Sequence, residues 1–283
     1  MRLIVILILT STAAAALVGC GASARNDSER ERVVASFYPL AYAAEQIGGP
    51  NVAVENLTPP GAEPHDLEVS PQDVADLRRA DLVLLLGRGF QPQLEDAAGD
   101  GDTVLRLLDL PGLNVDESDD PHVWLDPARY AKIVARIGRA LGRPAAAGRL
   151  EQRLHGLDDE FRAGLAHCRR HEIVTSHEAF AYLAERYGLE QIAITGLSPE
   201  AEPDPRKLQG VVDLVREHAV TTVYFETLVS PRIAETVARE TGAQTAVLDP
   251  IEGLTEEEAA RGDDYFTLMR RNLATLEAGL GCS

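Results

Sequence analysis

The chain has 283 residues, 45% of them hydrophobic, which is enough for one large or two modest domains with a proper core. Its 27 Lys and Arg against 45 Asp and Glu give a formal net charge of −18, so nucleic acid is not expected as a partner. This acidity suits an extracellular domain that is soluble.

The first 19 residues are predicted to be a secretion signal. Arg2 precedes a short apolar stretch, and small residues precede the expected cleavage site. The sequence Leu-Val-Gly-Cys at positions 17–20 resembles the bacterial lipobox, which implies cleavage before Cys20 and lipidation of its thiol. Residues 20–31 would then be a flexible, lipidated tether. The expected location is extracytoplasmic, anchored to the bacterial cell membrane.

Residues 32–144 alternate apolar, strand-like runs with helical patterns and are predicted to form an N-terminal α/β lobe. Ser70, Pro71 and Asp73 mark the start of one helix, with the pattern of a capping box. Residues 82–86 are continuously apolar, as in a strand that is covered on both faces. Strands are expected at 33–36, 52–57, 82–86 and 103–107, and helices at 40–47, from 70, at 92–98 and at 130–141.

Residues 145–170 are predicted to form a long linking helix. Apolar residues recur at spacings of four and three along one face, and no strand signal interrupts them. A helix of this length would span roughly 35 Å, which is the size of a domain. It could therefore join two lobes.

Residues 171–283 resume the alternation and are predicted to form a C-terminal α/β lobe. Strands are expected at 172–175, 191–194, 221–225 and 244–248, and helices at 177–187, 205–218, from 230 and at 264–278. Each lobe would thus hold a mostly parallel four-stranded sheet flanked by helices. Cys168 and Cys282 are an even pair in an oxidising compartment once Cys20 is lipidated, so a disulfide is their simplest use.

Four possible metal ligands each follow a strand or a strand-like run: His65, His122, His177 and Asp249. In open α/β sheets, loops that leave the carboxyl ends of the strands can converge on one crevice. Three imidazoles and one carboxylate would complete a tetrahedral zinc shell. Proline precedes His65 and His122 and follows Asp249, which stiffens all three loops.

Three glutamates are candidates to hold the second ring nitrogen of a ligating histidine: Glu63, Glu178 and Glu226. Glu226 ends a predicted strand and is expected to face the cleft, whereas solvent exposure suits Glu63 and Glu178 equally well. The four other histidines fall among charged residues and are expected to be solvated; they are His155, His167, His171 and His218.

A zinc hydrolase would need the same residue types, but the known catalytic motifs are incomplete. The sequence His-Glu-Ala-Phe-Ala from position 177 lacks the second histidine of the zincin helix. Gly-Leu-Ser-Pro-Glu at 196–200 lacks the closing glycine of a nucleophile elbow. These motifs do not support an enzyme.

Four segments, taken together, resemble the metal-binding lipoproteins of bacterial zinc and manganese ABC importers. They are Gly-Ala-Glu-Pro-His-Asp-Leu-Glu at 61–68, Asp-Pro-His-Val-Trp-Leu-Asp-Pro at 120–127, Thr-Ser-His-Glu-Ala-Phe-Ala-Tyr at 175–182 and Leu-Asp-Pro at 248–250. The likeness covers nearly all of residues 32–280. It implies that His65, His122, His177 and Asp249 are the ligands, two from each lobe. It departs at residues 113–120, which lack the histidines of the insert found in many zinc members.

The resemblance implies a monomeric, zinc-binding lipoprotein that captures a divalent metal between two lobes and delivers it to an ABC permease. In the family, histidine at the position of His177 is common in zinc carriers and glutamate in manganese carriers, and imidazole suits Zn²⁺ better than Mn²⁺. Delivery of manganese or iron, surface adhesion and zinc hydrolysis are the alternatives.

Overall fold

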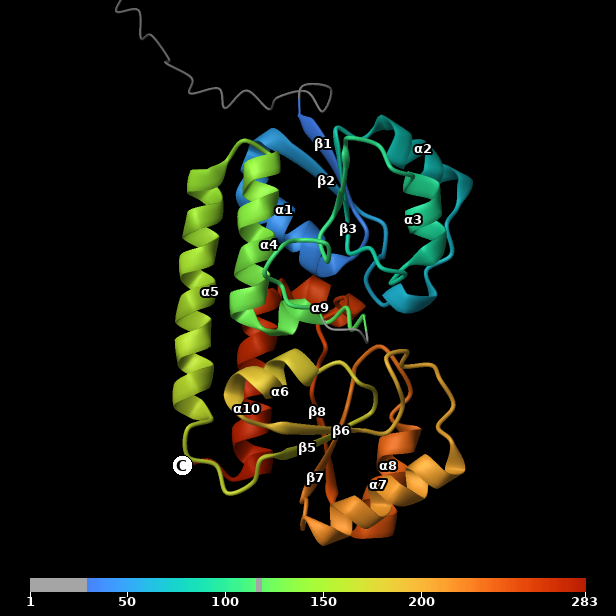
Figure 1. The fold of residues 1–283 in the computed structure, drawn as a ribbon, viewed down its shortest axis with the longest axis vertical. Coiled ribbons are helices and arrows are strands. Elements are labelled where there is room, and N and C mark those ends of the chain that lie inside the picture. Colours follow the sequence, from blue (N-terminus) through green and yellow to red (C-terminus); the bar gives the residue numbers. More distant parts are fainter. Residues whose placement is uncertain (1–29, 116–118) are drawn as a thin grey trace, which may run out of the picture.

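A computed structural model describes residues 30–115 and 119–283. The predicted signal peptide, Cys20 and nearly all of the predicted tether lie outside the described residues. Within the described ranges, no helix has both the length and the apolar character needed to cross a membrane. Figure 1 shows two α/β lobes, one above the other, with long helices along one side of both. This is the predicted fold class.

The first sheet is entirely parallel, with the strand order β2-β1-β3-β4. Alternate residues of its strands pack on opposite faces: Val33 and Leu84 belong to the core beneath α1 and α4, whereas Val34 and Leu85 pack beneath α2 and α3. Both faces are therefore covered, as the continuous apolar runs predicted. The elements are β1 (Glu31–Ala35), α1 (Tyr38–Gly48), β2 (Val52–Asn56), α2 (Pro71–Arg79), β3 (Leu82–Leu85), α3 (Pro92–Ala98), β4 (Val104–Arg106) and α4 (Pro127–Ala140).

The second sheet repeats this topology, with the parallel order β6-β5-β7-β8. Helices α7 and α8 cover one face around Val174 and Val223, and α6 and α10 lie on the other. The elements are β5 (Glu172–Thr175), α6 (Ala181–Tyr187), β6 (Glu190–Ala193), α7 (Pro205–Glu217), β7 (Thr222–Phe225), α8 (Arg232–Thr241), β8 (Gln244–Val247), α9 (Glu256–Arg261) and α10 (Tyr265–Leu280). Residues 30–115 and 119–283 also include three short 3₁₀ helices: η2 (Gly49–Asn51), η3 (Pro64–Asp66) and η4 (Val123–Leu125).

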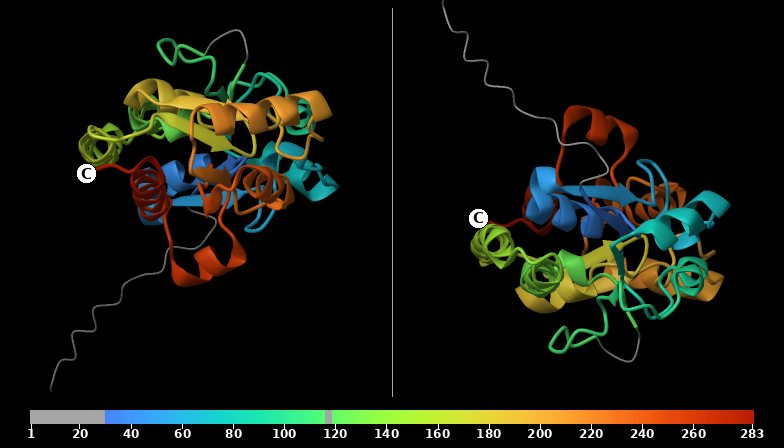
Figure 2. Two further views of the ribbon diagram at one scale, coloured as in Figure 1. Left: turned by 90° about the horizontal axis from the view of Figure 1, so that it is seen from below. Right: turned by 90° about the horizontal axis from the view of Figure 1, so that it is seen from above.

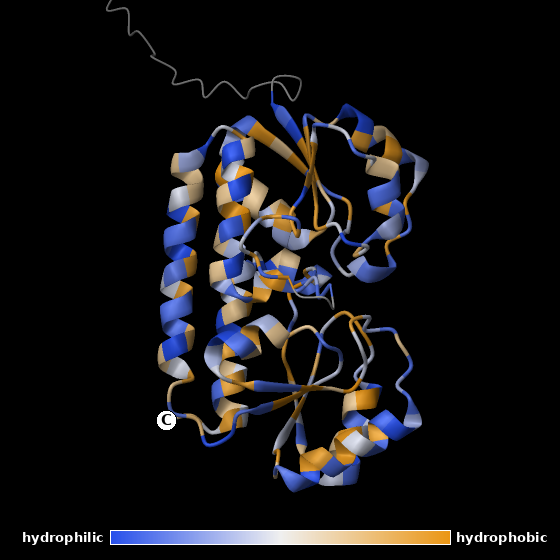
Figure 3. Ribbon diagram, in the orientation of Figure 1, coloured by the Kyte–Doolittle hydropathy of each residue, from blue (hydrophilic) through white to orange (hydrophobic). Residues whose placement is uncertain are grey.

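Helix α5 (Pro144–Gly164) joins the two sheets and lies beside α10, as Figure 2 shows. Its buried face carries the apolar residues that predicted it, and the face seen in Figure 3 is largely hydrophilic. The helix ends at Gly164, before the predicted end. Cys168, in the segment after it, forms the predicted disulfide with Cys282, which follows α10.

Two elements of the C-terminal half differ from the prediction. The helix expected from residue 177 begins only at Ala181, because the Thr175 hydroxyl donates to the His177 carbonyl at 2.8 Å and the Glu178 N–H donates to the Gly196 carbonyl. These bonds hold residues 176–180 as a loop beside the sheet. Helix α9 was not predicted, although Thr255 and Glu258 form its capping box.

Candidate metal centre

His65 lies on η3, in the loop that follows β2. Glu63 caps this turn by accepting the His65 backbone N–H at 3.1 Å, and the Gln91 amide donates to the Pro64 carbonyl at 3.1 Å. The His65 ring packs against the Phe90 ring at a centroid distance of 4.7 Å. The imidazole is therefore fixed by its turn and by packing, and its side chain keeps 11% exposure.

His122 lies just before η4, on the loop that follows β4. One oxygen of Asp120 accepts the His122 backbone N–H at 3.0 Å and lies 2.6 Å from Nδ1 of the ring. Tyr182, on α6 of the other lobe, donates to the Asp120 carbonyl at 3.0 Å. These contacts orient the ring so that Nε2 faces Glu252 and His177 of the other lobe.

His177 follows β5 directly, and its ring is held in the same way. Its Nδ1 lies 2.8 Å from a carboxylate oxygen of Glu226, which follows β7. Both side chains are buried, with exposures of 1% and 3%. Two of the three imidazoles thus have one nitrogen on a carboxylate, which is the usual support of a ligating histidine.

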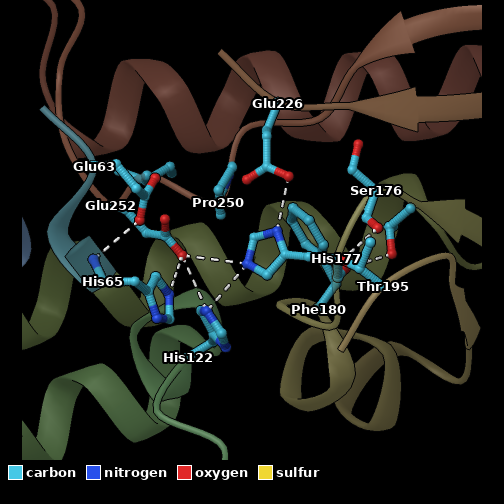
Figure 4. Close-up of polar contacts among 12 residues, drawn as sticks. Glu63, His65, His122, Ser176, His177, Phe180, Thr195, Glu226, Pro250 and Glu252 are labelled. Carbon is cyan, nitrogen blue, oxygen red and sulfur yellow. Dashed lines mark hydrogen bonds and ion pairs between the residues drawn. The ribbon is translucent and has the colours of Figure 1, made fainter. Parts of the chain in front are cut away.

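Glu252 lies between β8 and α9 and brings its carboxylate to all three rings. Its Oε1 is 3.3 Å from Nε2 of His65, 3.0 Å from Nε2 of His122 and 3.4 Å from Nε2 of His177. The ligand atoms of these four residues all lie within 4.8 Å of one another. Figure 4 shows the three rings converging on this carboxylate from both lobes.

Asp249, the carboxylate expected from the sequence, is not in this group. Its Oδ1 instead accepts the backbone N–H of Ile251 at 2.7 Å, within its own loop. Three residues later, on the far side of Pro250, the same loop turns Glu252 inward. The structure therefore brings together the three expected histidines with Glu252 in place of Asp249.

The three glutamates expected near the rings occupy different surroundings. Glu226 contacts the His177 ring, whereas the contact of Glu63 is with the backbone of His65. The Glu178 side chain is exposed and lines a separate 320 Å³ pocket, together with Asp120 and Tyr182. The carboxylate that supports His122, Asp120, was not predicted, although it directly precedes Pro121 in the motif that carries the ligand.

Electrostatics at the centre favour charged imidazoles when no metal is bound. Burial lowers the pKa of His177, but its contacts with Glu226 and Glu252 outweigh burial and raise the pKa to about 10. The pKa of His122 is also raised, because Asp120 and Glu252 outweigh its burial. Burial opposes ionisation of Glu252, but the three histidines hold its pKa well below the usual range. Without metal, the cluster is thus a network of protonated histidines and carboxylates, and a metal cation can take the place of the imidazole protons.

The donor set and its spacing fit a tetrahedral metal ion. In a tetrahedral zinc site with ligand distances near 2.0 Å, neighbouring donors lie about 3.3 Å apart. The Nε2 atoms of His122 and His177 are 3.3 Å apart, and the contacts of Glu252 Oε1 with the rings bracket the same value. Four of the six donor pairs thus have this spacing already, and moving the His65 nitrogen, which lies within 4.8 Å of the other two imidazole nitrogens, would place all four atoms around one ion.

The remaining histidines lie away from the centre. His155, His167, His171 and His218 are exposed, as expected, and His218 pairs with Glu172 at 3.0 Å.

Comparison with known proteins places the chain in a family. The model of the periplasmic zinc-uptake complex component A matches residues 33–279. The zinc-binding lipoprotein AdcA of Streptococcus pneumoniae serotype 4 is 34% identical over 307 residues, which is 96% of this chain and 60% of the relative. The high-affinity zinc uptake system protein ZnuA of Bacillus subtilis is 33% identical, over 91% of this chain and 90% of the relative. The chain spans 55–60% of the length of the AdcA relatives.

Two solved structures share the fold. The laminin-binding protein Lmb of Streptococcus agalactiae, described as bifunctional with adhesin and metal-transporting activity, matches with a TM-score of 0.80 and 31% identity, over 88% of this chain and 99% of that one. The Zn(II)-bound ZnuA-like domain of Streptococcus pneumoniae AdcA matches with a TM-score of 0.74 and 33% identity, over 89% and 99% of the two chains.

Proposed function

The chain belongs to the family of periplasmic zinc-uptake complex component A, and we propose that it captures Zn²⁺ between its lobes and delivers it to an ABC permease. The convergence of three imidazole nitrogens on Glu252 Oε1 carries this proposal. Zn²⁺ is the cargo, held by His65, His122, His177 and Glu252. Because two ligands come from each lobe, binding would tie the lobes together, and any separation of them would open the site for delivery.

Zinc is the proposed cargo because of the type and number of the donors. Three nitrogens and one carboxylate suit tetrahedral zinc, whereas manganese favours oxygen donors and higher coordination. Four protein ligands leave no position for a reactive water, so the proposal includes no catalytic step. A zinc hydrolase would require one ligand to be a water.

We further propose that the protein is held at the outer face of the cell membrane through lipid on Cys20, as the sequence Leu-Val-Gly-Cys suggests. Two acyl chains of a diacylglyceryl group would make the anchoring stable, since one chain binds only weakly. Cys20→Ala should release protein into the medium or leave it unprocessed. Unchanged incorporation of labelled lipid into this variant would refute the anchor.

A second candidate function is adhesion, which the likeness to Lmb favours. Laminin binding to the purified, immobilised protein, measured with and without zinc, tests it. Saturable binding supports this second function, and its absence removes it without affecting the metal-binding proposal.

Zinc titration of the purified protein tests the main proposal. Metal-free protein should bind one Zn²⁺ per chain and compete with a chromophoric chelator, and Glu252→Ala should weaken zinc binding by more than tenfold. Glu178→Ala is the matched control, because this exposed glutamate adjoins His177 and does not contact its ring. Failure of the wild type to compete for zinc, or equal affinities for zinc and manganese, would contradict the proposal.

A further inference from the structure

Ile251, directly before Glu252, has an unusual backbone conformation. Its φ is +55°, in the left-handed region that β-branched residues rarely adopt. The residue is fully buried, so solvent does not compensate for the strain. A strained residue persists only where its surroundings determine its conformation, and such residues cluster at functional sites. The strained conformation of Ile251, immediately before a proposed ligand, is therefore expected to serve the metal site.

Asp249 supplies one of the forces. Its Oδ1 accepts the Ile251 N–H at 2.7 Å and so forms an Asx turn that spans Pro250. The residue is buried, with 5% exposure; its Oδ1 makes this backbone contact, whereas Oδ2 has no hydrogen-bond partner among the described residues. Burial raises the pKa of Asp249 to about 7, but Oδ1 accepts the Ile251 N–H whether or not the acid is ionised, so the bond can compensate for the conformation of Ile251.

Asn272, on α10, fixes Asp249 itself. Its side-chain oxygen accepts the Asp249 N–H at 2.9 Å, and its amide nitrogen donates to the Asp249 carbonyl at 2.6 Å. Asn272 is 2% exposed, and these two bonds use both ends of its amide. Trp124, from the other lobe, donates to the Pro250 carbonyl at 2.7 Å. The loop before Glu252 is thus held by its own Asp249 and by side chains from two other elements, α10 and η4.

We infer that Asp249 and Asn272 are positioning residues that hold residues 249–251 in the conformation which carries the Glu252 carboxylate to the three imidazoles. The inference rests on the proposed function, because it concerns how tightly the same centre binds metal. It assigns to Asp249 a contact with the backbone and none with the metal. Asn272 acts one step further out, through Asp249.

The test compares zinc affinities of the full chain by chelator competition. Asp249→Ala should weaken zinc binding by about 10- to 100-fold, the usual cost of removing a group that supports a metal ligand. Asp249→Asn should retain most of the affinity that Asp249→Ala loses, because the asparagine oxygen still accepts the Ile251 N–H. If Asp249 were itself a ligand, the asparagine variant would lose as much as the alanine variant, and the inference would be overturned.

A double-mutant cycle separates positioning from general damage. In a Glu252→Ala background, Asp249→Ala should cause little further loss, because a group that acts only through Glu252 has nothing left to position. Fully additive losses would overturn the inference. With Co²⁺ as a spectroscopic probe, Asp249→Ala should give the visible spectrum of Glu252→Ala, and a wild-type spectrum would count against it.

Asn272→Ala is the second variant, for use if Asp249→Ala does not fold, and it should also weaken zinc binding. Wild-type affinity in the folded Asp249→Ala or Asn272→Ala variant would overturn the inference and leave the proposed function intact. The proposed function fails by a different result, namely a wild-type protein that does not bind zinc.

Discussion

His177 shows how single residues set the proton balance of the centre. With a pKa raised to about 10 by Glu226 and Glu252, its ring carries a proton at neutral pH when no metal is bound, and Zn²⁺ must displace that proton. Apparent zinc affinity should therefore rise with pH from about 6 to 8.5, above the range expected from an ordinary histidine pKa of about 6.5. Calorimetry in buffers of different ionisation enthalpy should detect proton release near pH 7. Zinc binding without proton release, at an affinity that does not change with pH, would contradict this view.

The identity of residue 177 should also set metal selectivity. His177→Glu replaces a borderline nitrogen donor with a hard oxygen donor. The variant should therefore bind zinc more weakly, and the difference between its affinities for zinc and manganese should be smaller than in the wild type. Competition titrations of both proteins with both metals measure this, with Glu178→Ala as the control. Unchanged zinc affinity in His177→Glu would show that this imidazole does not select the metal.

The sequence predicts three of the four residues that converge at the candidate metal centre. The three histidines could be found because each follows a strand and the ends of parallel strands converge. Glu252 could not be found in that way, because its direction depends on the left-handed conformation of Ile251, which local propensity disfavours. The Asp-Pro sequence at 249–250 marks the correct loop but not the residue that reaches the centre.

Among the elements, α5 and α6 are joined by a buried carboxylate. Asp158 on α5 accepts two hydrogen bonds of 2.6 Å from Arg186 and one of 3.0 Å from Tyr187, both on α6. These contacts hold the pKa of Asp158 below its usual range despite its burial. The acid therefore stabilises the fold above its unfolded pKa, and this contribution is lost as the pH falls through the lowered value.

Asp158→Ala should lower the free energy of unfolding by about 3 kcal/mol, because it leaves a partly buried Arg186 with fewer partners. Urea denaturation measures the change. The exposed neighbour Asp159→Ala is the control and should change stability by less than about 0.5 kcal/mol. Equal effects of the two variants would show that the bonds of Asp158 contribute nothing specific.

Sequence patterns predicted the elements well wherever burial dominates. The apolar runs of β3 and the apolar face of α5 are decided by local periodicity. Residues 177–180 were predicted as helix because their departure from helix depends in part on the bond from Glu178 to Gly196, a tertiary contact that local periodicity does not reveal. This segment contains His177, whose ring contacts Glu252 and His122 at the metal centre.

Across the whole molecule, one hydrophobic core runs from the first sheet through α5 and α10 to the second sheet. The disulfide between Cys168 and Cys282 links the segment after α5 to the segment after α10, over a sequence separation of 114. In the chain-entropy model such a loop is worth about 4–5 kcal/mol. Replacing both cysteines by serine should lower the free energy of unfolding by about this amount, and reduced wild type should match the variant. Two free thiols in a non-reduced digest of native protein would refute the bond.

Anomalous diffraction at the zinc edge from crystals of the zinc-loaded protein tests the central claim most directly. We expect one zinc peak between the lobes, about 2.0–2.2 Å from Nε2 of His65, His122 and His177 and from a carboxylate oxygen of Glu252. Asp249 should remain bonded to the Ile251 N–H. A zinc ion bound to Asp249 in place of Glu252, or a water in the fourth position, would contradict the account.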